Sequence, residues 1–537
     1  MSAVVEYIVV GSGCSGAMAA QTLIEAGKQV TMLDVGVQNP DYDTAVPSQD
    51  YLTIRKTDPN QHHYLIGKKA EGLTWGDIGK GAQVTPTRKH LSQLAEDYLP
   101  VESDTFSPIE SLGYGGLGIG WGLQCWEYSR AEQRAAGLDS SAMPEAYEIV
   151  SKRIGVSATR DEASPYTMGD LQTFQPSPTM DRNHRRIYQN YQKKRRRFNA
   201  QGLHMGRTPL ALLTQDLGQR KKYAYHDMDF YTDNGHSAWR PWMTVNELRK
   251  HKNFTYKDGL LVLSFKEEKG GVLVHALQIS DHSEVTFKAK KLILAANPLS
   301  SGRIVLRSLG DFAQKLPLLC NPYTYIPCLQ PGLVGKAAEA KKMGFAQLTL
   351  FLDEKNDHKD LSVASLYSYQ SLMLFRIIRQ LPLNFRDARI IMRYLMSGLE
   401  IMGVHHPDMH TKTNYMQRLE RPGNPTGDAL AVRYEVAPER LAELRRREKV
   451  CMAAMRSVGV FPLKRVDPGY GASVHYAGTL PYSQEPKPFH LRPDGKLHGT
   501  KHVYVADSAG FTYLPAKGLT FSLLANAHLT AERALRS

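Results

Sequence analysis

The sequence lacks the features that mark several classes of protein. Among its 537 residues there are only five cysteines, and no two of them form a C-x-x-C pair. This scarcity argues against a disulfide framework and a cysteine zinc site, and it fits a reducing compartment. No run of about 18 uncharged apolar residues occurs, so no segment is expected to span a membrane. The cysteines are Cys14, Cys125, Cys320, Cys328 and Cys451.

The first residues also lack the marks of a secretory signal. The opening MSAVVEYIVVGSG has no basic stretch and no small-residue cleavage site, and its apolar run leads directly into a glycine loop. We therefore expect a strand at this end and a cytoplasmic protein.

Acidic residues are too few to balance the basic ones. The 53 Asp and Glu residues face 67 Lys and Arg residues, which gives a formal net charge of +14. Such a charge favours an anionic substrate, an acidic membrane surface or nucleic acid, without choosing among them. The chain is too long for one simple core, so two or more domains are expected.

Residues 7–36 carry the pattern of a dinucleotide-binding unit. A short apolar strand is followed by a G-x-G-x-x-G loop, a run of strong helix formers and a second strand that ends in Asp34. The glycines, Gly11, Gly13 and Gly16, permit a tight turn, close approach of a pyrophosphate, and close packing of helix on strand. Asp34 can accept hydrogen bonds from ribose hydroxyls. The pattern favours FAD or NAD over NADP and does not separate the first two.

The local structure of four later segments can be predicted from their sequence. Residues 111–126 hold six glycines before and between two tryptophans, which indicates a backbone that lies against something large and flat. Residues 258–279 predict two strands joined at Gly270 and Gly271. Residues 290–308 predict a buried strand, a turn and a helix, and residues 502–535 predict a strand, a loop and a long C-terminal helix.

In this order, the segments resemble the glucose–methanol–choline (GMC) family of flavin oxidoreductases. The resemblance rests on the N-terminal loop and on GGLGIGWG, LAANPLSSGRIVLRS, HYAGTLP and VYVADSAGFTYLPAKGLTFSLLANA. It covers both ends of the chain and the block 258–308, whereas residues 130–250 and 310–465 match no motif.

The resemblance implies an α/β fold with a discontinuous Rossmann-like FAD-binding domain. A substrate domain of antiparallel sheet and helices would be inserted into it. The FAD-binding parts would be residues 1–45, 105–130, 246–310 and 466–537, and the substrate parts residues 131–245 and 311–465.

The same resemblance implies which residues hold the cofactor. Asp34 would bind the ribose, Asp507 the ribityl–pyrophosphate region, and Val262 would offer its backbone to adenine. Some family members tether the flavin through a histidine in the glycine segment; residues 113–122 have none, so non-covalent FAD is expected. The other implied cofactor residues are Gly11, Ser12, Gly13 and Gly16 at the pyrophosphate, Gly115, Gly116, Leu117 and Gly118 beside the isoalloxazine, Ala296, and Gly518, Leu519 and Thr520 at the pyrimidine end.

His475 is the candidate base. A single histidine among small residues, as in GASVHYAGTLPYS, is more often a structural group. The resemblance, however, places His475 at the family's active-site histidine, opposite the flavin N5, where a neutral imidazole takes the hydroxyl proton. The family usually has a second His or Asn before the last helix, and here that position is Gly518. The neighbouring Lys517 either replaces it as a catalytic partner or points to solvent.

We therefore expect FAD-dependent oxidation of an alcohol to a carbonyl, with a sugar, a polyol or an apolar or lipid-linked alcohol as substrate. Oxygen, a quinone or a redox protein would accept the electrons. A flavin lyase or decarboxylase without net redox change is the alternative, and a flavin-binding structural or sensor protein is the third reading.

The unmatched regions carry three further patterns. Residues 182–198 hold eight Lys and Arg and no acid, which is more typical of a solvated helix face than of an anion site, and no nucleic-acid motif accompanies them. Residues 366–404 predict two amphipathic helices divided by Pro382, which suit an anionic membrane surface, a substrate cap or core packing. His406 and His410 stand at i, i+4, but no second ligand cluster supports a metal. The arginines of the helical pair are Arg376, Arg379, Arg386, Arg389 and Arg393.

Overall fold

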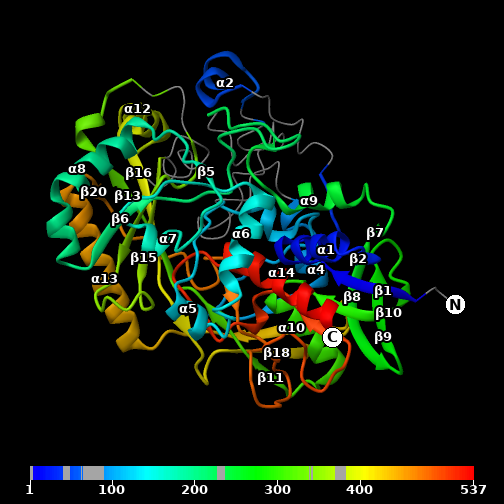
Figure 1. Ribbon diagram of the computed structural model, residues 1–537. Coiled ribbons are helices and arrows are strands. Elements are labelled where there is room, and N and C mark those ends of the chain that lie inside the picture. The colour runs from blue at the N-terminus through cyan, green and yellow to red at the C-terminus, as the bar shows by residue number, and fades with distance from the viewer. Residues whose placement is uncertain are drawn as a thin grey trace.

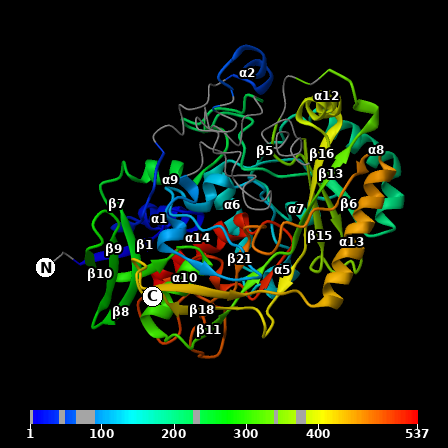
Figure 2. The ribbon, with the colours of Figure 1, turned by 180° about the vertical axis from the view of Figure 1, so that it is seen from behind.

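Two large β-sheets lie at opposite ends of the molecule, with helices and loops between them (Figures 1 and 2). The computed structural model describes residues 4–39, 49–61, 63, 90–225, 236–337, 339, 343–368 and 382–537. The fold is the mixed α/β architecture that the motifs predict.

The first sheet collects strands from distant parts of the chain. Its parallel part has the order β7–β2–β1–β10, with β22 also pairing β10, and an antiparallel meander β10–β9–β8 extends it. The strands are β1 (Val5–Val10), β2 (Val30–Leu33), β7 (Phe254–Lys257), β8 (Leu260–Glu268), β9 (Gly271–Gln278), β10 (Glu284–Leu294) and β22 (Val503–Val505). The predicted dinucleotide strands, the hairpin at Gly270 and Gly271, and the strand of residues 502–535 are thereby confirmed.

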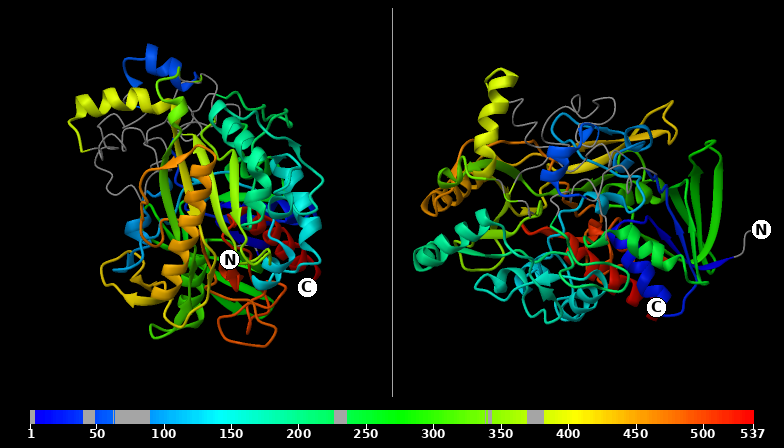
Figure 3. Two further views of the ribbon diagram at one scale, coloured as in Figure 1. Left: turned by 90° about the vertical axis from the view of Figure 1, so that its left-hand side faces the viewer. Right: turned by 90° about the horizontal axis from the view of Figure 1, so that it is seen from above.

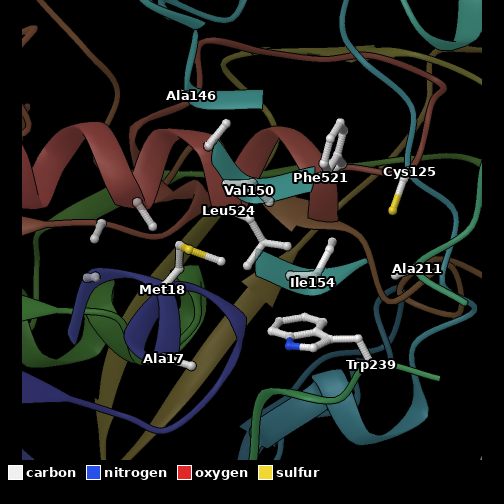
Figure 4. Close-up of a cluster of buried hydrophobic side chains, with 14 of the residues drawn as sticks. Ala17, Met18, Cys125, Ala146, Val150, Ile154, Ala211, Trp239, Phe521 and Leu524 are labelled. Carbon is white, nitrogen blue, oxygen red and sulfur yellow. The ribbon is translucent and has the colours of Figure 1, made fainter. Parts of the chain in front are cut away.

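Three helices bury a shared apolar core beside this sheet. They are α1 (Cys14–Glu25), α6 (Met143–Ile154) and α14 (Thr520–Arg536). Met18, Val150 and Leu524 meet between them, each fully buried (Figure 4). Helix α6 thus packs with the dinucleotide unit, although it lies in the range 131–245 predicted for the substrate domain. On the other side, α10 (Pro298–Leu309) packs against β8, as the strand–turn–helix pattern predicts.

The second sheet is antiparallel, and its two long helices lie on one face. Its order is β20–β13–β16–β15–β14–β6. Helices α8 (Arg182–Asn199) and α13 (Pro438–Ser457) share an apolar core with this sheet, and the left view of Figure 3 shows the orange α13 in front of the strands. Because side chains alternate along a strand, the opposite face points toward the centre of the molecule. The strands are β6 (Leu203–Arg207), β13 (Tyr323–Leu329), β14 (Leu348–Leu352), β15 (Ser362–Ser368), β16 (Leu399–His405) and β20 (Phe461–Pro462).

A four-stranded sheet, β11–β18–β19–β3, packs on the dinucleotide side. Met416, Leu430 and Val432 share a core with β8 and β10. The strands are β3 (Val101–Glu102), β11 (Lys315–Pro317), β18 (Tyr415–Glu420) and β19 (Asp428–Arg433). Short pairs join β4 (Ser157–Ala158) to β5 (Gln175–Pro176), β12 (Leu319–Cys320) to β21 (Tyr476–Ala477), and β17 (Asp408–Met409) to β23 (Tyr513–Leu514).

The remaining helices are short. They are α2 (Tyr51–Thr57), α4 (Ala95–Tyr98), α5 (Arg130–Ala135), α7 (Ser164–Thr167), α9 (Pro241–Leu248) and α12 (Phe385–Leu395). No helix in the described part of the chain is long and apolar enough to cross a membrane.

The prediction for residues 366–404 was wrong in part. Residues 366–368 end β15 and residues 399–404 belong to β16, because an apolar run buried on both faces is satisfied by two strand neighbours. Only α12 matches the second predicted helix; residues 369–381, with Arg376 and Arg379, lie outside the described residues. Helix α8 does form over the basic segment, with its apolar residues buried and most of its arginines and lysines exposed.

Candidate active site

One cavity of about 330 Å³ opens between the two large sheets. It is lined by most of the residues that the motifs predict, drawn from five distant segments of the chain. These are Gly11, Ser12, Gly13, Asp34, Gly116, Leu117, Gly118, Val262, Ala296, His475, Asp507, Gly518, Leu519 and Thr520. Gly16, Gly115 and Lys517 are not among the lining residues.

The dinucleotide loop forms a cradle that only glycine permits. Gly11 has φ +97°, and a Cβ there would lie 2.8 Å from the Ala295 carbonyl oxygen. A Cβ on Gly16 would lie 1.9 Å from the Gly11 oxygen, so Gly16 acts by packing and not by lining the cavity. Gly13 precedes the first turn of α1, where backbone N–H groups and the helix dipole favour a phosphate. The close approach of the backbone and the free N–H groups of the first turn fit a phosphate-bearing ligand.

Two carboxylates flank this cradle, the half-buried Asp34 and the buried Asp507. Asp34 accepts hydrogen bonds from the Ser12 hydroxyl and, at 2.9 Å, from the Tyr256 hydroxyl. Asp507 accepts from Ser301 Oγ at 2.5 Å. Burial raises the pKa of each carboxyl to about 6. Donors from a ribose or ribityl chain would stabilise the ionised forms, so both positions fit the cofactor.

Tyr256 was not predicted from the sequence. It belongs to β7, which joins the sheet beside β2, and the pairing of Met32 with Tyr256 brings its side chain to Asp34. No motif near Tyr256 in the sequence predicts the pairing of β7 with β2.

His475 has a defined tautomer. Its Nδ1 lies 3.0 Å from Asn321 Oδ1, while Asn321 Nδ2 donates to the carbonyl oxygens of His406 (2.7 Å) and Pro515 (3.0 Å). Because two carbonyls fix the amide orientation, Nδ1 of His475 must carry the hydrogen and donate it. The lone pair therefore resides on Nε2. Burial lowers the pKa of His475 to about 4, so the ring is neutral near pH 7.

The backbone before His475 is unusual. Val474 has φ +59°, a left-handed conformation that a β-branched residue rarely adopts. The turn is closed by a hydrogen bond from the Val474 N–H to the Gly471 carbonyl, and it orients the next residue toward the cavity.

Gly518 lies beside Trp126 and His475. A Cβ built there would be in ordinary van der Waals contact, 3.5 Å from the ring of Trp126 and 4.0 Å from Cε1 of His475. The position at which the second His or Asn of the family was expected therefore lies next to His475 but carries no side chain.

Lys517 points away from this space and is not at the surface. Its ammonium donates to Glu132 Oε2 at 2.7 Å and to the Glu127 carbonyl oxygen at 3.0 Å, and only 1% of the residue is exposed. This buried ion pair joins the segment before α14 to α5.

The second sheet supplies the opposite wall of the cavity. Its inner face contributes Tyr323, Tyr325, Tyr367, Ile401 and His405. None of these five residues was predicted from the sequence, because the periodicity of a strand does not show which of its faces meets a ligand.

His406 and His410, considered as metal ligands, bind different partners. His406 Nδ1 lies within hydrogen-bond distance of the Ser362 hydroxyl, and His410 Nε2 of the Gly478 carbonyl. Among the described residues, no cluster of three metal-ligating side chains is found.

Comparisons with known proteins extend the resemblance beyond the motifs. No protein-family model matches the chain. Paromamine 6'-oxidase from Streptomyces fradiae is 22% identical over 555 residues, covering 97% of this chain and 89% of that protein. The 6'''-hydroxyparomomycin C oxidase from Streptomyces lividus is 22% identical over 564 residues, covering 98% and 92%.

Among solved structures, pyridoxine 4-oxidase from Mesorbium loti has the same fold. The TM-score is 0.59 at 13% identity, and the match covers 99% of each chain. The chain is thus similar along nearly its whole length to two proteins named as oxidases, and it shares the fold of a third.

Proposed function

We propose that the protein oxidises an alcohol to a carbonyl compound, with His475 as the base. The observation that carries the proposal is the fixed tautomer of His475: the bond to Asn321 occupies Nδ1 and leaves the Nε2 lone pair for the hydroxyl proton. FAD, when bound, supplies the ring that accepts the hydride from the carbinol carbon. The protein residues bind and orient both molecules and exclude water.

The relatives support an oxidase. All three similar proteins are named as oxidases. We therefore favour oxygen over a quinone or a redox protein as the electron acceptor.

The aromatic wall favours an alcohol carried on a ring. Tyr323, Tyr325 and Tyr367 present flat, partly apolar surfaces with hydroxyl groups, on which the face of a sugar or another ring can pack. Among the described lining residues, the charged ones, Asp34, Asp507, Arg303 and Arg307, belong to the dinucleotide segments and not to this wall. Ring alcohols such as sugars, aminosugars and pyridoxine are therefore the first substrates to screen.

Anaerobic mixing with these alcohols tests the function. Bleaching of the flavin with formation of a carbonyl supports oxidation. Product without bleaching would identify the lyase or decarboxylase alternative, and neither result would favour a binding protein.

The cofactor is expected to be non-covalent. Acid precipitation should release the yellow colour into the supernatant, because the glycine segment offers no histidine as a tether. Colour that stays with the precipitated protein, with a flavin-labelled peptide in the mass spectrum, would contradict this.

His475→Ala is expected to keep FAD and to lose alcohol-dependent flavin reduction by about 10²–10⁴-fold, because the proton acceptor is gone. Stopped-flow absorbance under anaerobic conditions measures the rate. An unchanged rate would make His475 a structural residue.

Lys517 is the contrasting residue, since its ion pair with Glu132 is structural. Lys517→Ala should lower the unfolding free energy by about 3–5 kcal/mol, because a buried carboxylate loses its partner. The double variant Lys517→Met/Glu132→Gln removes both charges and should recover stability and flavin reduction. A loss of reduction in the stable double variant as large as that of His475→Ala would instead make Lys517 catalytic.

The pH profile should report the low pKa of His475. The base is active when neutral, so flavin reduction should decline as pH falls through about 4. Asn321→Asp places a carboxylate at Nδ1, favours the imidazolium and should move this limb upward by about 1–3 units. Asn321→Ala is the control: it removes the orienting bond without adding charge, so it should slow reduction without that upward shift. A wild-type limb at the ordinary histidine value would refute the assignment.

We also propose that α12 contacts an anionic membrane surface. Figure 3 shows this yellow helix projecting from the body of the molecule, and Ile390, Ile391 and Tyr394 are 47%, 40% and 59% exposed. Arg386 and Arg393 are exposed on the same helix. Apolar side chains with flanking cations are typical of an interfacial helix, and each cation near the surface contributes about 1 kcal/mol.

Vesicle co-sedimentation tests this contact. Binding to phosphatidylserine-containing vesicles should weaken at high salt and in the variant with serine at positions 390, 391 and 394. Leu309→Ser, which changes an exposed leucine on α10, should bind like the wild type. No sedimentation at low salt would leave α12 as a soluble surface helix.

A further inference from the structure

The active site lacks one group that the chemistry needs beside the base. The hydroxyl that loses its proton to His475 also needs a hydrogen-bond partner to position it as the C–O bond gains double-bond character. Gly518 offers no side chain. Lys517 is engaged with Glu132. A partner from another element would complete the site.

His405 lies in the right place. It is the last residue of β16, on the inner face of the second sheet, and it lines the same cavity as His475. The two imidazole rings are stacked, with centroids 5.1 Å apart and planes inclined by 26°. Tyr323 also packs against His405, with its ring centroid 4.4 Å away. The ring of His405 is therefore in contact with two aromatic neighbours.

The nitrogen atoms of His405 are not used by the fold. Only 9% of the residue is exposed, and its Nδ1 is buried without a hydrogen-bond partner among the described residues. Nε2 forms no hydrogen bond with the described residues either and is not among the fully buried atoms, and the residue lines the cavity. An imidazole that is buried without hydrogen bonds destabilises the folded protein. A ligand in the cavity that forms a hydrogen bond to this imidazole would offset that cost.

His405 is also in a suitable charge state. Burial, together with His475 and His406, holds the pKa of His405 well below its usual range. A neutral imidazole keeps one donor and one acceptor, so it can bind a hydroxyl without competing with His475 for the proton.

We propose that His405 is the second active-site residue, whose imidazole hydrogen-bonds the reacting hydroxyl group beside His475. The inference rests on the proposed alcohol oxidation. In this reaction the hydroxyl proton would pass to Nε2 of His475, and FAD, when bound, would supply the acceptor for the hydride and the two electrons it carries. His405 donates a hydrogen bond to the substrate oxygen and keeps its own proton throughout. The second sheet, and not the last helix, thus completes the catalytic pair.

Two substitutions separate this role from simple stacking. His405→Phe keeps an aromatic ring beside His475 and Tyr323 but removes both nitrogens, so flavin reduction should slow by about 10²–10³-fold. His405→Gln restores a hydrogen-bonding group without the ring and should recover part of the rate. His251→Phe, which makes the same exchange at an exposed histidine that is not among the cavity-lining residues, is the matched control and should reduce FAD within a few-fold of the wild type.

Single-turnover reduction is measured anaerobically for each variant, after FAD content and thermal melting have been compared with the wild type. A wild-type rate in His405→Phe would overturn the inference and leave the proposed oxidation standing. The same would follow if Gln were no better than Phe at equal FAD content. If the FAD-loaded wild type were reduced by none of the alcohols, the proposed function itself would fall, and this inference with it.

Discussion

The parallel pairing of β1, β10 and β22 is the constraint on which the rest of the molecule depends. It joins residues 5–10, 284–294 and 503–505 side by side, so that the loops after all three strands leave at one edge of the sheet. Backbone bonds extend the pairing into these loops: the Ala295 N–H donates to Val10 and the Ala506 N–H to Leu294. Gly11 approaches Ala295, which follows β10, so closely that there is no space for a Cβ on Gly11. The glycine loop is therefore part of this edge of the sheet. Parallel strands place ligands at their carboxyl ends for this reason.

Throughout the cavity, burial away from water determines the charge state of the carboxyl and imidazole groups that line it. Burial raises the pKa of Asp34 and Asp507 and lowers that of His475 and His405. The carboxylates therefore favour hydrogen-bond donors of a ligand, whereas the imidazoles remain neutral. A base that is neutral over most of the pH range, with its tautomer fixed by Asn321, suits the removal of a hydroxyl proton.

The active site shows how a missing side chain changes its surroundings. Gly518 lets Trp126 approach, and Trp126 belongs to a small core with Phe351 and Ala516 that connects the second sheet to the last segment. The ion pair between Lys517 and Glu132 also holds this segment against α5. These contacts fix the entry to α14 firmly, and the proton transfer and hydrogen bonding that we propose for the cavity are assigned to side chains on β16 and on the loop that carries His475.

The sequence by itself determined the elements whose signal is local. The spacing of Gly11, Gly13 and Gly16, the Gly270–Gly271 turn, and the entry of the last helix near Gly518 each follow from backbone sterics within a few residues, and each is found in the structure. The family resemblance also indicated His475 correctly as a residue of the cavity.

Only the tertiary structure decided which other side chains reach the cavity. Tyr256, Asn321 and His405 lie outside the motifs, and strand pairing or a bridging amide brings them to their partners. The helical prediction at residues 399–404 failed for the same reason, because two neighbouring strands satisfy that backbone. Lys517 could not be assigned from its position either, since its direction depends on a carboxylate 385 residues away. Local steric preferences depend on consecutive residues and can therefore be predicted from a short stretch of sequence. The choice of tertiary contacts depends on long-range packing, which no short stretch specifies.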